Sequence, residues 1–85
     1  QEGFDLNLEE IHIGPHSKLV GSSIRQTILG QISNAVIIGL HDIHGQARVV
    51  PAENESIAGI QLNAGDVLIA LGSEIQLQRL KDFAE

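Results

Sequence analysis

Hydrophobic and polar positions alternate in short blocks along the chain, and turn residues bound each block. Over Leu6–Ile13 the apolar residues fall at alternate positions with one slip of phase at Glu9-Glu10, which predicts a strand with a bulge or a late start. The nearly continuous apolar run Asn34–Leu40 predicts a central strand covered on both faces. The run Val67–Leu71 predicts a further buried strand, because it is too short for a buried helix.

Two helix starts are indicated by a Ser that precedes a Gln by three residues. Ser73 and Gln76 have the spacing of a capping box, and apolar residues recur at helical spacing after them, so a helix is predicted from about Ser73. Ser23 and Gln26 have the same spacing. They predict a second helix over Ser22–Gly30.

Turn chemistry separates these elements. In Asn63–Asp66, Gly65 is free to take a positive φ and Asp66 is expected to stabilise the turn by accepting hydrogen bonds from nearby backbone. The stretch Asp42–Gly45 predicts a hairpin turn into another strand over Gln46–Val50.

Taken together, the elements predict an α+β fold in the order β-α-β-β-β-α. The expected architecture is a small sandwich with helices packed on a mostly antiparallel sheet. Pro51 closes the last hairpin strand, and Ala52–Leu62 is predicted to be a polar loop. Residues 1–5 are expected to form a flexible N-terminal edge, and residues 6–85 a single domain.

Composition and charge narrow the function classes. The net charge is −6 with only five Lys and Arg residues in 85, which argues against a nucleic-acid partner because such binding requires cations to neutralise phosphates. The chain has no cysteine, so it has neither disulfides nor thiolate metal ligands. The longest apolar run is far below the roughly 20 residues that cross a bilayer, and direct membrane insertion is not expected.

Four stretches follow one another along the chain: LEEIHI, SKLVGSSI, AVIIGLH and AGDVLIALGSEIQLQRL. In this order they resemble the C-terminal lobe of the regulator-of-potassium-conductance family, also called the TrkA-C domain. The stretch AGDVLIALG is the most specific of them. The resemblance covers Leu8–Leu80 and implies a TrkA-C-like sandwich.

The resemblance also implies a function. Lobes of this family regulate potassium channels and potassium transport systems as homodimers in the cytosol, behind a Rossmann lobe and a membrane pore that would lie outside this chain. This predicts a cytoplasmic, ligand-sensing domain of a membrane-associated protein that gates ion flux by a change in dimer geometry. The alternative is a purely structural dimerisation lobe of a transporter for another substrate.

A ligand site is implied as well. In members that bind cyclic di-AMP, the nucleotide lies between two lobes near the start of the strand that matches Asn34–Leu40. Carried onto this chain, the lining consists of Asn34, Ala35, Val36 and Ile37, with His41 nearby. Many members carry Arg at the end of this strand where this chain has His41-Asp42, which removes a charge-assisted contact to phosphate.

Candidate metal chemistry is concentrated in the stretch LHDIHG. His41, Asp42 and His44 provide nitrogen and oxygen ligands within four residues, and His12 or His16 could join them to bind a divalent cation such as Zn²⁺. The alternative is a solvated turn in which Asp and Gly only stabilise the backbone conformation of the turn. The acidic stretch Glu53–Glu55 allows the same choice between a Ca²⁺ site and a solvated loop.

No pattern in the sequence indicates catalysis. His12 is expected to be a solvent-facing histidine on a strand, because no nucleophile is paired with it. Ser22 and Ser23 are expected at a helix start, since no nucleophile elbow surrounds them. The chain is therefore predicted not to be an enzyme.

Overall fold

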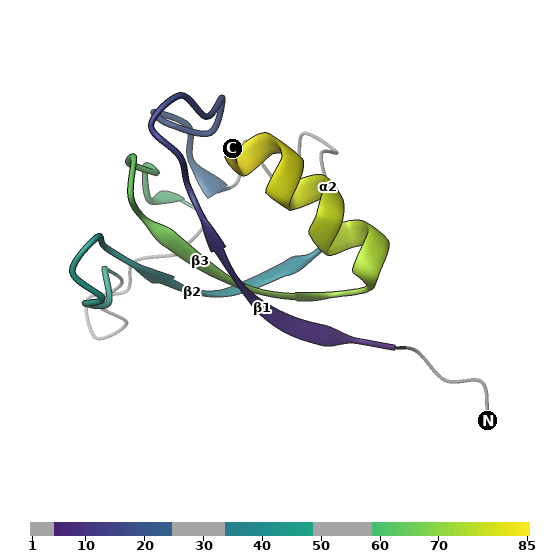
Figure 1. Cartoon of the computed structure of the whole chain (residues 1–85). Coiled ribbons are helices and arrows are strands. Elements are labelled where there is room, and N and C mark those ends of the chain that lie inside the picture. Colours follow the sequence, from purple (N-terminus) through teal and green to yellow (C-terminus); the bar gives the residue numbers. More distant parts are fainter. Residues whose placement is uncertain (1–4, 25–33, 49–58) are drawn as a thin grey trace.

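The computed structural model describes residues 5–24, 34–48 and 59–85. Three strands, β1 (Asn7–His12), β2 (Val36–His41) and β3 (Val67–Gly72), form an antiparallel sheet in the order β1-β3-β2. The helix α2 (Glu74–Ala84) lies across one face of this sheet (Figure 1). The prediction of an α+β fold with an antiparallel sheet is thus confirmed for the described residues.

β3 occupies the centre of the described sheet and pairs with both other strands. Its residues Leu68 and Ala70 are fully buried. The prediction that Asn34–Leu40 is covered on both faces is wrong, and in the described three-stranded order β3, not β2, is central. An unbroken apolar run can reflect burial on both faces, but here Val36 and Ile38 remain more than half exposed.

β1 pairs with β3 without interruption from Asn7 opposite Gly72 to His12 opposite Val67. The predicted bulge or late start at Glu9-Glu10 is therefore wrong. The phase slips because the apolar residues of β1 lie on two different faces: Leu8 is exposed, whereas Ile11 is buried. The irregular pairing of the described sheet lies instead in β2, between Ile37 and Gly39.

The turn after β2 was predicted to lead into a strand over Gln46–Val50. Within the described residues this segment makes only an isolated bridge between His41 and Ala47, and residues 49 and 50 lie outside the description. The predicted helix over Ser22–Gly30 lies outside the described residues from residue 25 onward. The same holds for Glu53–Glu55 and most of the predicted polar loop.

The start of α2 confirms the capping prediction. The Ser73 hydroxyl accepts from the Gln76 amide at 3.2 Å, and the Gln76 side chain accepts from the Ser73 amide at 2.9 Å. This reciprocal pair satisfies backbone donors that the first helical turn leaves without partners. Buried apolar residues of α2 complete the core between helix and sheet; they are Leu77, Leu80 and Ala84.

The segment after β1 holds the C-terminal end of α2. The Gly14 amide donates to the Ala84 carbonyl at 2.7 Å, and the hydroxyl of buried Ser17 donates to the Phe83 carbonyl. These two bonds satisfy carbonyl groups that a helix end otherwise leaves to water. They fix the helix over one face of the sheet and leave the other face as the candidate surface.

Candidate functional site

The face of the sheet that points away from α2 is the candidate functional surface, and we call it the outer face. Residues paired directly across antiparallel strands project to the same side, so the register assigns three rows to this face. The rows are Leu8–Leu71–Val36, Glu10–Ile69–Gly39 and His12–Val67–His41. Leu68 and Ala70 project to the opposite side and are buried in the core.

One end of the outer face is apolar. Leu8 is 60% exposed and Val36 is 57% exposed, and both flank the half-buried Leu71. Ile38, at the irregularity of β2, is 55% exposed. Aliphatic residues grouped in this way differ from singly scattered exposed residues, and such groups mark interaction surfaces.

The other end of the outer face is polar and hollowed. A hollow of about 420 Å³ lies here, and its lining includes Glu10, His12, His41 and Val67 together with residues of the adjoining turns. His12 is exposed, as predicted for a strand-face histidine. The register brings His12 and His41 to either side of Val67, a relationship that the linear sequence does not reveal because 28 residues separate them.

Asp42 organises the turn that follows β2. Its carboxylate accepts from the backbone amides of His44 at 2.8 Å and Gln46 at 2.9 Å. The Gln46 amide lowers the pKa of the Asp42 carboxyl below its ordinary value, and the amide and imidazole of His44 act in the same direction. These contacts are those of a solvated turn, which was the alternative to a metal site in this stretch.

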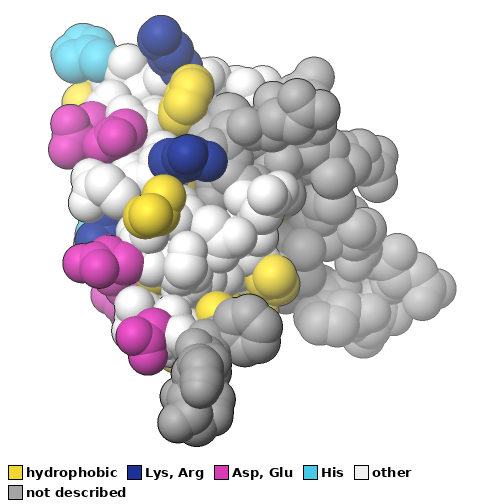
Figure 2. All heavy atoms as spheres, turned by 90° about the vertical axis from the view of Figure 1, so that its right-hand side faces the viewer, with side chains coloured by type: hydrophobic (Ala, Val, Ile, Leu, Met, Phe, Trp, Pro, Cys, Tyr) yellow, Lys and Arg dark blue, Asp and Glu magenta, His cyan; other side chains and the backbone are white. Residues whose placement is uncertain are grey.

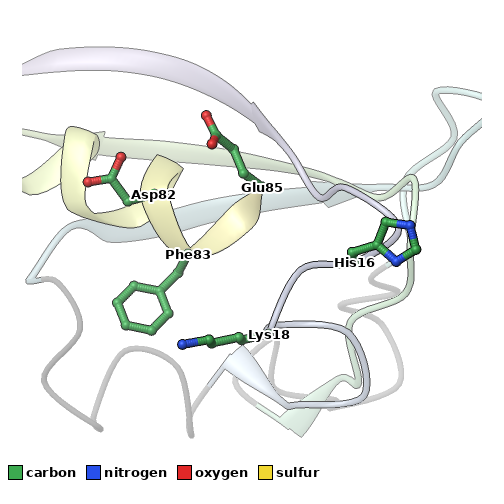
Figure 3. A pocket seen from close by; sticks show the side chains of 5 residues that line it. All are labelled: His16, Lys18, Asp82, Phe83 and Glu85. Carbon is green, nitrogen blue, oxygen red and sulfur yellow. The ribbon is translucent and has the colours of Figure 1, made fainter.

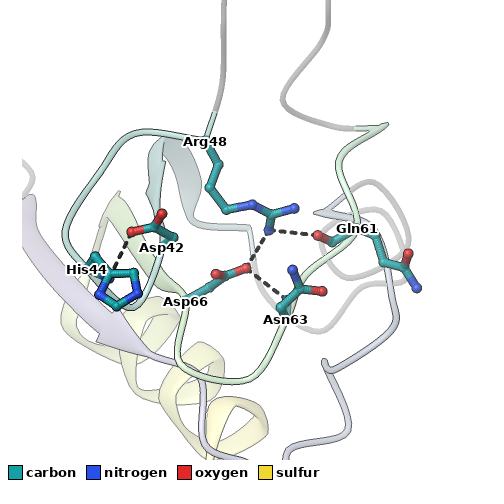
Figure 4. A network of polar contacts seen from close by, with 6 residues as sticks. All are labelled: Asp42, His44, Arg48, Gln61, Asn63 and Asp66. Carbon is teal, nitrogen blue, oxygen red and sulfur yellow. Dashed lines mark hydrogen bonds and ion pairs between the residues drawn. The ribbon is translucent and has the colours of Figure 1, made fainter.

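The predicted metal ligands are split between two elements. His41 lies on β2. Asp42 and His44 belong to the turn that follows it (Figure 4). Within residues 5–24, 34–48 and 59–85, no three His, Asp or Glu side chains converge closely enough to hold a metal ion as they stand. His16 lies apart, beside the C-terminal end of α2.

The residues predicted to line a nucleotide cleft lie on opposite faces of the sheet or outside β2. Ala35 is buried in the core and Ile37 packs against it, whereas Val36 is exposed on the outer face. Asn34 is exposed just before β2. The alternation of side chains along a strand thus leaves Val36 and His41 as the two predicted lining residues that share the outer face.

A polar network connects the turns beside this surface. Asp66 accepts from the Asn63 amide at 2.8 Å, which confirms its predicted role in the turn. The Arg48 guanidinium pairs with the same carboxylate and donates to the Gln61 carbonyl at 2.8 Å (Figure 4). The pairing of Arg48 with Asp66 was not predicted from the sequence, because no local pattern links two residues that lie 18 positions apart.

A second hollow, of about 320 Å³, lies at the C-terminal end of α2. Figure 3 shows Lys18 and Phe83 extending to the same side, whereas the carboxylates of Asp82 and Glu85 point away from them. The charged groups therefore do not converge on a common ligand position. This arrangement provides neither a paired acid and base nor a set of metal ligands.

The surface charge of the described residues agrees with the negative net charge. Figure 2 shows acidic side chains along one edge of the molecule, with the basic side chains of that view standing apart from one another. Such a distribution offers no continuous basic surface in that view for a phosphate backbone. Among the described residues, no helix combines the length and the apolar character needed to cross a bilayer.

The geometry defines a small α+β domain with one open sheet face. Neither the family models nor the curated proteins compared with this chain gave a match. The features that bear on function are therefore the outer face and the sequence patterns of the chain.

Proposed function

We propose that this chain is a regulatory, ligand-sensing and dimerisation domain of a potassium channel or potassium transport system. The outer face is the observation that carries the dimerisation part of the proposal. The TrkA-C-like stretches of the sequence support the link to potassium transport. In this proposal the domain works on the cytosolic side of a membrane protein whose pore and Rossmann lobe lie outside this chain.

A second copy is the occupant that best fits the outer face. A domain of 85 residues buries a modest fraction of its surface, and an exposed sheet face with Leu8 and Val36 leaves apolar area that a partner would cover. Closed two-fold pairing is the commonest way for identical chains to cover such a face. Glu10 is the one carboxylate in the three rows, so pairing here brings few of the acidic residues together despite the net charge of −6.

Such a pair provides a route to regulation. A ligand changes the equilibrium between two dimer arrangements only if it binds one of them more tightly. A ligand held between two outer faces meets this condition, because the shape of the space between them depends on how the copies are oriented. The attached transporter would then respond to the change in orientation.

Sedimentation of this chain and of two variants tests the assembly. At roughly 50 μM, where even weak specific interfaces are populated, we expect a dimer. Val36→Asp places a charge in the apolar end of the proposed interface and should give a monomer that retains its fold, since residue 36 is more than half exposed. Ile75→Asp is the matched control, because Ile75 is equally aliphatic and 66% exposed but lies on α2, away from the outer face.

The outcomes separate the alternatives. A monomeric wild-type chain, or a dimer that survives Val36→Asp, would rule out pairing through the outer face, and a dimer lost only in Ile75→Asp would place the interface on α2. Calorimetry with cyclic di-AMP then tests nucleotide sensing. The absence of heat at high micromolar nucleotide would leave the purely structural dimerisation lobe as the better description.

Potassium flux tests the remaining part of the proposal. With the full-length membrane protein in vesicles, we expect Val36→Asp to alter potassium flux and Ile75→Asp to leave it unchanged. A protein that moves no potassium in this assay would contradict the assignment to potassium transport, while the sedimentation result would stand.

A further inference from the structure

The row His12–Val67–His41 joins two imidazoles on the outer face. Each histidine lies directly opposite Val67 in the register, one from β1 and one from β2. Two strand spacings of 4.7–4.9 Å separate the two backbones, so their Cα atoms lie about 10 Å apart. Val67 has a shorter side chain than histidine, and all three residues line the same hollow.

We infer that His12 and His41 bind a divalent transition-metal ion between them, over Val67. Neutral imidazole is a common ligand for Zn²⁺ and related ions. Both side chains line the same hollow of about 420 Å³, and Glu10 and Asp42 line it too. A carboxylate and water can therefore complete the coordination of an ion held by the two imidazoles.

This site differs from one built on the turn residues alone. The Asp42 carboxylate accepts from two backbone amides, and His44 lies in the same turn. Because no three candidate ligands among the described residues converge as the side chains stand, binding requires the rings of His12 and His41 to rotate toward each other. His12 is exposed and His41 is half-buried at the mouth of the hollow, so neither ring is locked within the core.

A divalent transition-metal ion would then be a ligand of the proposed sensing surface. The inference rests on the proposed function only for the consequence of binding, since an ion at this row would lie on the face through which two copies are proposed to pair. Binding itself requires one chain. Disrupting the dimer with Val36→Asp therefore separates metal binding by one chain from the proposed pairing of two chains.

Calorimetric titration with Zn²⁺ at pH 7.5 tests the site, with Mg²⁺ as the probe that prefers oxygen ligands. The chain has four histidines, and two of them lie outside the row. We expect His12→Gln and His41→Gln each to weaken Zn²⁺ binding about tenfold or more, since even the loss of an outer-shell partner costs 10- to 100-fold. His16→Gln and His44→Gln are the matched controls and should bind Zn²⁺ as the wild type does, because both side chains are exposed and lie outside the row.

Three outcomes would overturn the inference. No heat with Zn²⁺ up to about 1 mM would exclude a useful site. An equal loss of affinity in His44→Gln would assign binding to the turn instead of the row. Loss of binding in Val36→Asp, with the fold retained in thermal melts, would show that a single chain does not form the site. Binding retained in that variant supports the site whether or not the wild-type chain is a dimer.

Discussion

The guanidinium of Arg48 pairs with the carboxylate of Asp66 and joins the segment after β2 to the turn before β3. The Asp66 side chain is only 3% exposed and that of Arg48 is 23% exposed. Asp66 also accepts from the Asn63 amide, and its own backbone carbonyl accepts from the Ile13 amide at 2.9 Å. This one residue therefore ties together the segments that border the hollow of the outer face.

Replacing Asp66 by Ala should lower the free energy of unfolding by about 1–3 kcal/mol, because the Asn63 amide and the Arg48 guanidinium both lose a charged acceptor. Urea denaturation measures the change. Glu9→Gln is the control, since the Glu9–Lys81 pair is more exposed and should be worth less than about 1 kcal/mol. Equal losses in the two variants would contradict the importance of burial for the Asp66 pair.

Gly65→Ala should be more destabilising than Gly45→Ala. Both glycines have a positive φ, which costs a residue with a Cβ about 1–2 kcal/mol. A Cβ at residue 65 would in addition lie 2.9 Å from the Ile43 side chain, whereas one at residue 45 meets no atom within 4 Å. Thermal melts compare the two, and Gly59→Ala, with no positive φ and open space around it, serves as the control.

If Gly45→Ala and Gly65→Ala shift the melting temperature equally, Ile43 moves aside at no cost. If Gly59→Ala shifts it as much as either of them, the backbone conformation is not the cause. The expected order of destabilisation is Gly65, then Gly45, then Gly59.

Acid should weaken the fold partly through Asp42. Its pKa in the folded chain is lowered, so its contribution to stability is present above the ordinary value of 3.8 and is lost as the pH falls through the folded value. Asp42→Asn keeps an oxygen acceptor but removes this titration. Below about pH 4 we therefore expect the variant to lose stability less steeply than the wild type.

The control for this pH series is Asp5→Asn, which removes one exposed carboxylate away from the turn. Denaturation at a series of pH values between about 5 and 2.5 measures both slopes. The same acid dependence in both variants would show that the amides of Gln46 and His44 do not stabilise the ionised carboxylate of Asp42.

How much of the fold the sequence predicts depends on how local each feature is. The turn at Gly65, the strand after it and the helix from Ser73 were all predictable, because positive φ, a short apolar run and a capping box involve neighbouring residues. The role of Asp66 in its own turn was predictable for the same reason. The exposed outer face of the sheet was not predictable, since an apolar residue in a strand gives the same sequence pattern whether its face of the sheet is covered or exposed.

The sequence by itself determined the α+β class, the elements around β3 and α2, and the types of side chain available for chemistry. Only the tertiary structure decided that β3 is central, that Arg48 reaches Asp66, and that His12 and His41 flank one valine. These relationships depend on strand order and register. Strand order and register are set by the long-range pairing that buries the most apolar surface while it satisfies the hydrogen bonds of the backbone. A short stretch of adjacent residues cannot show which of the possible pairings does this.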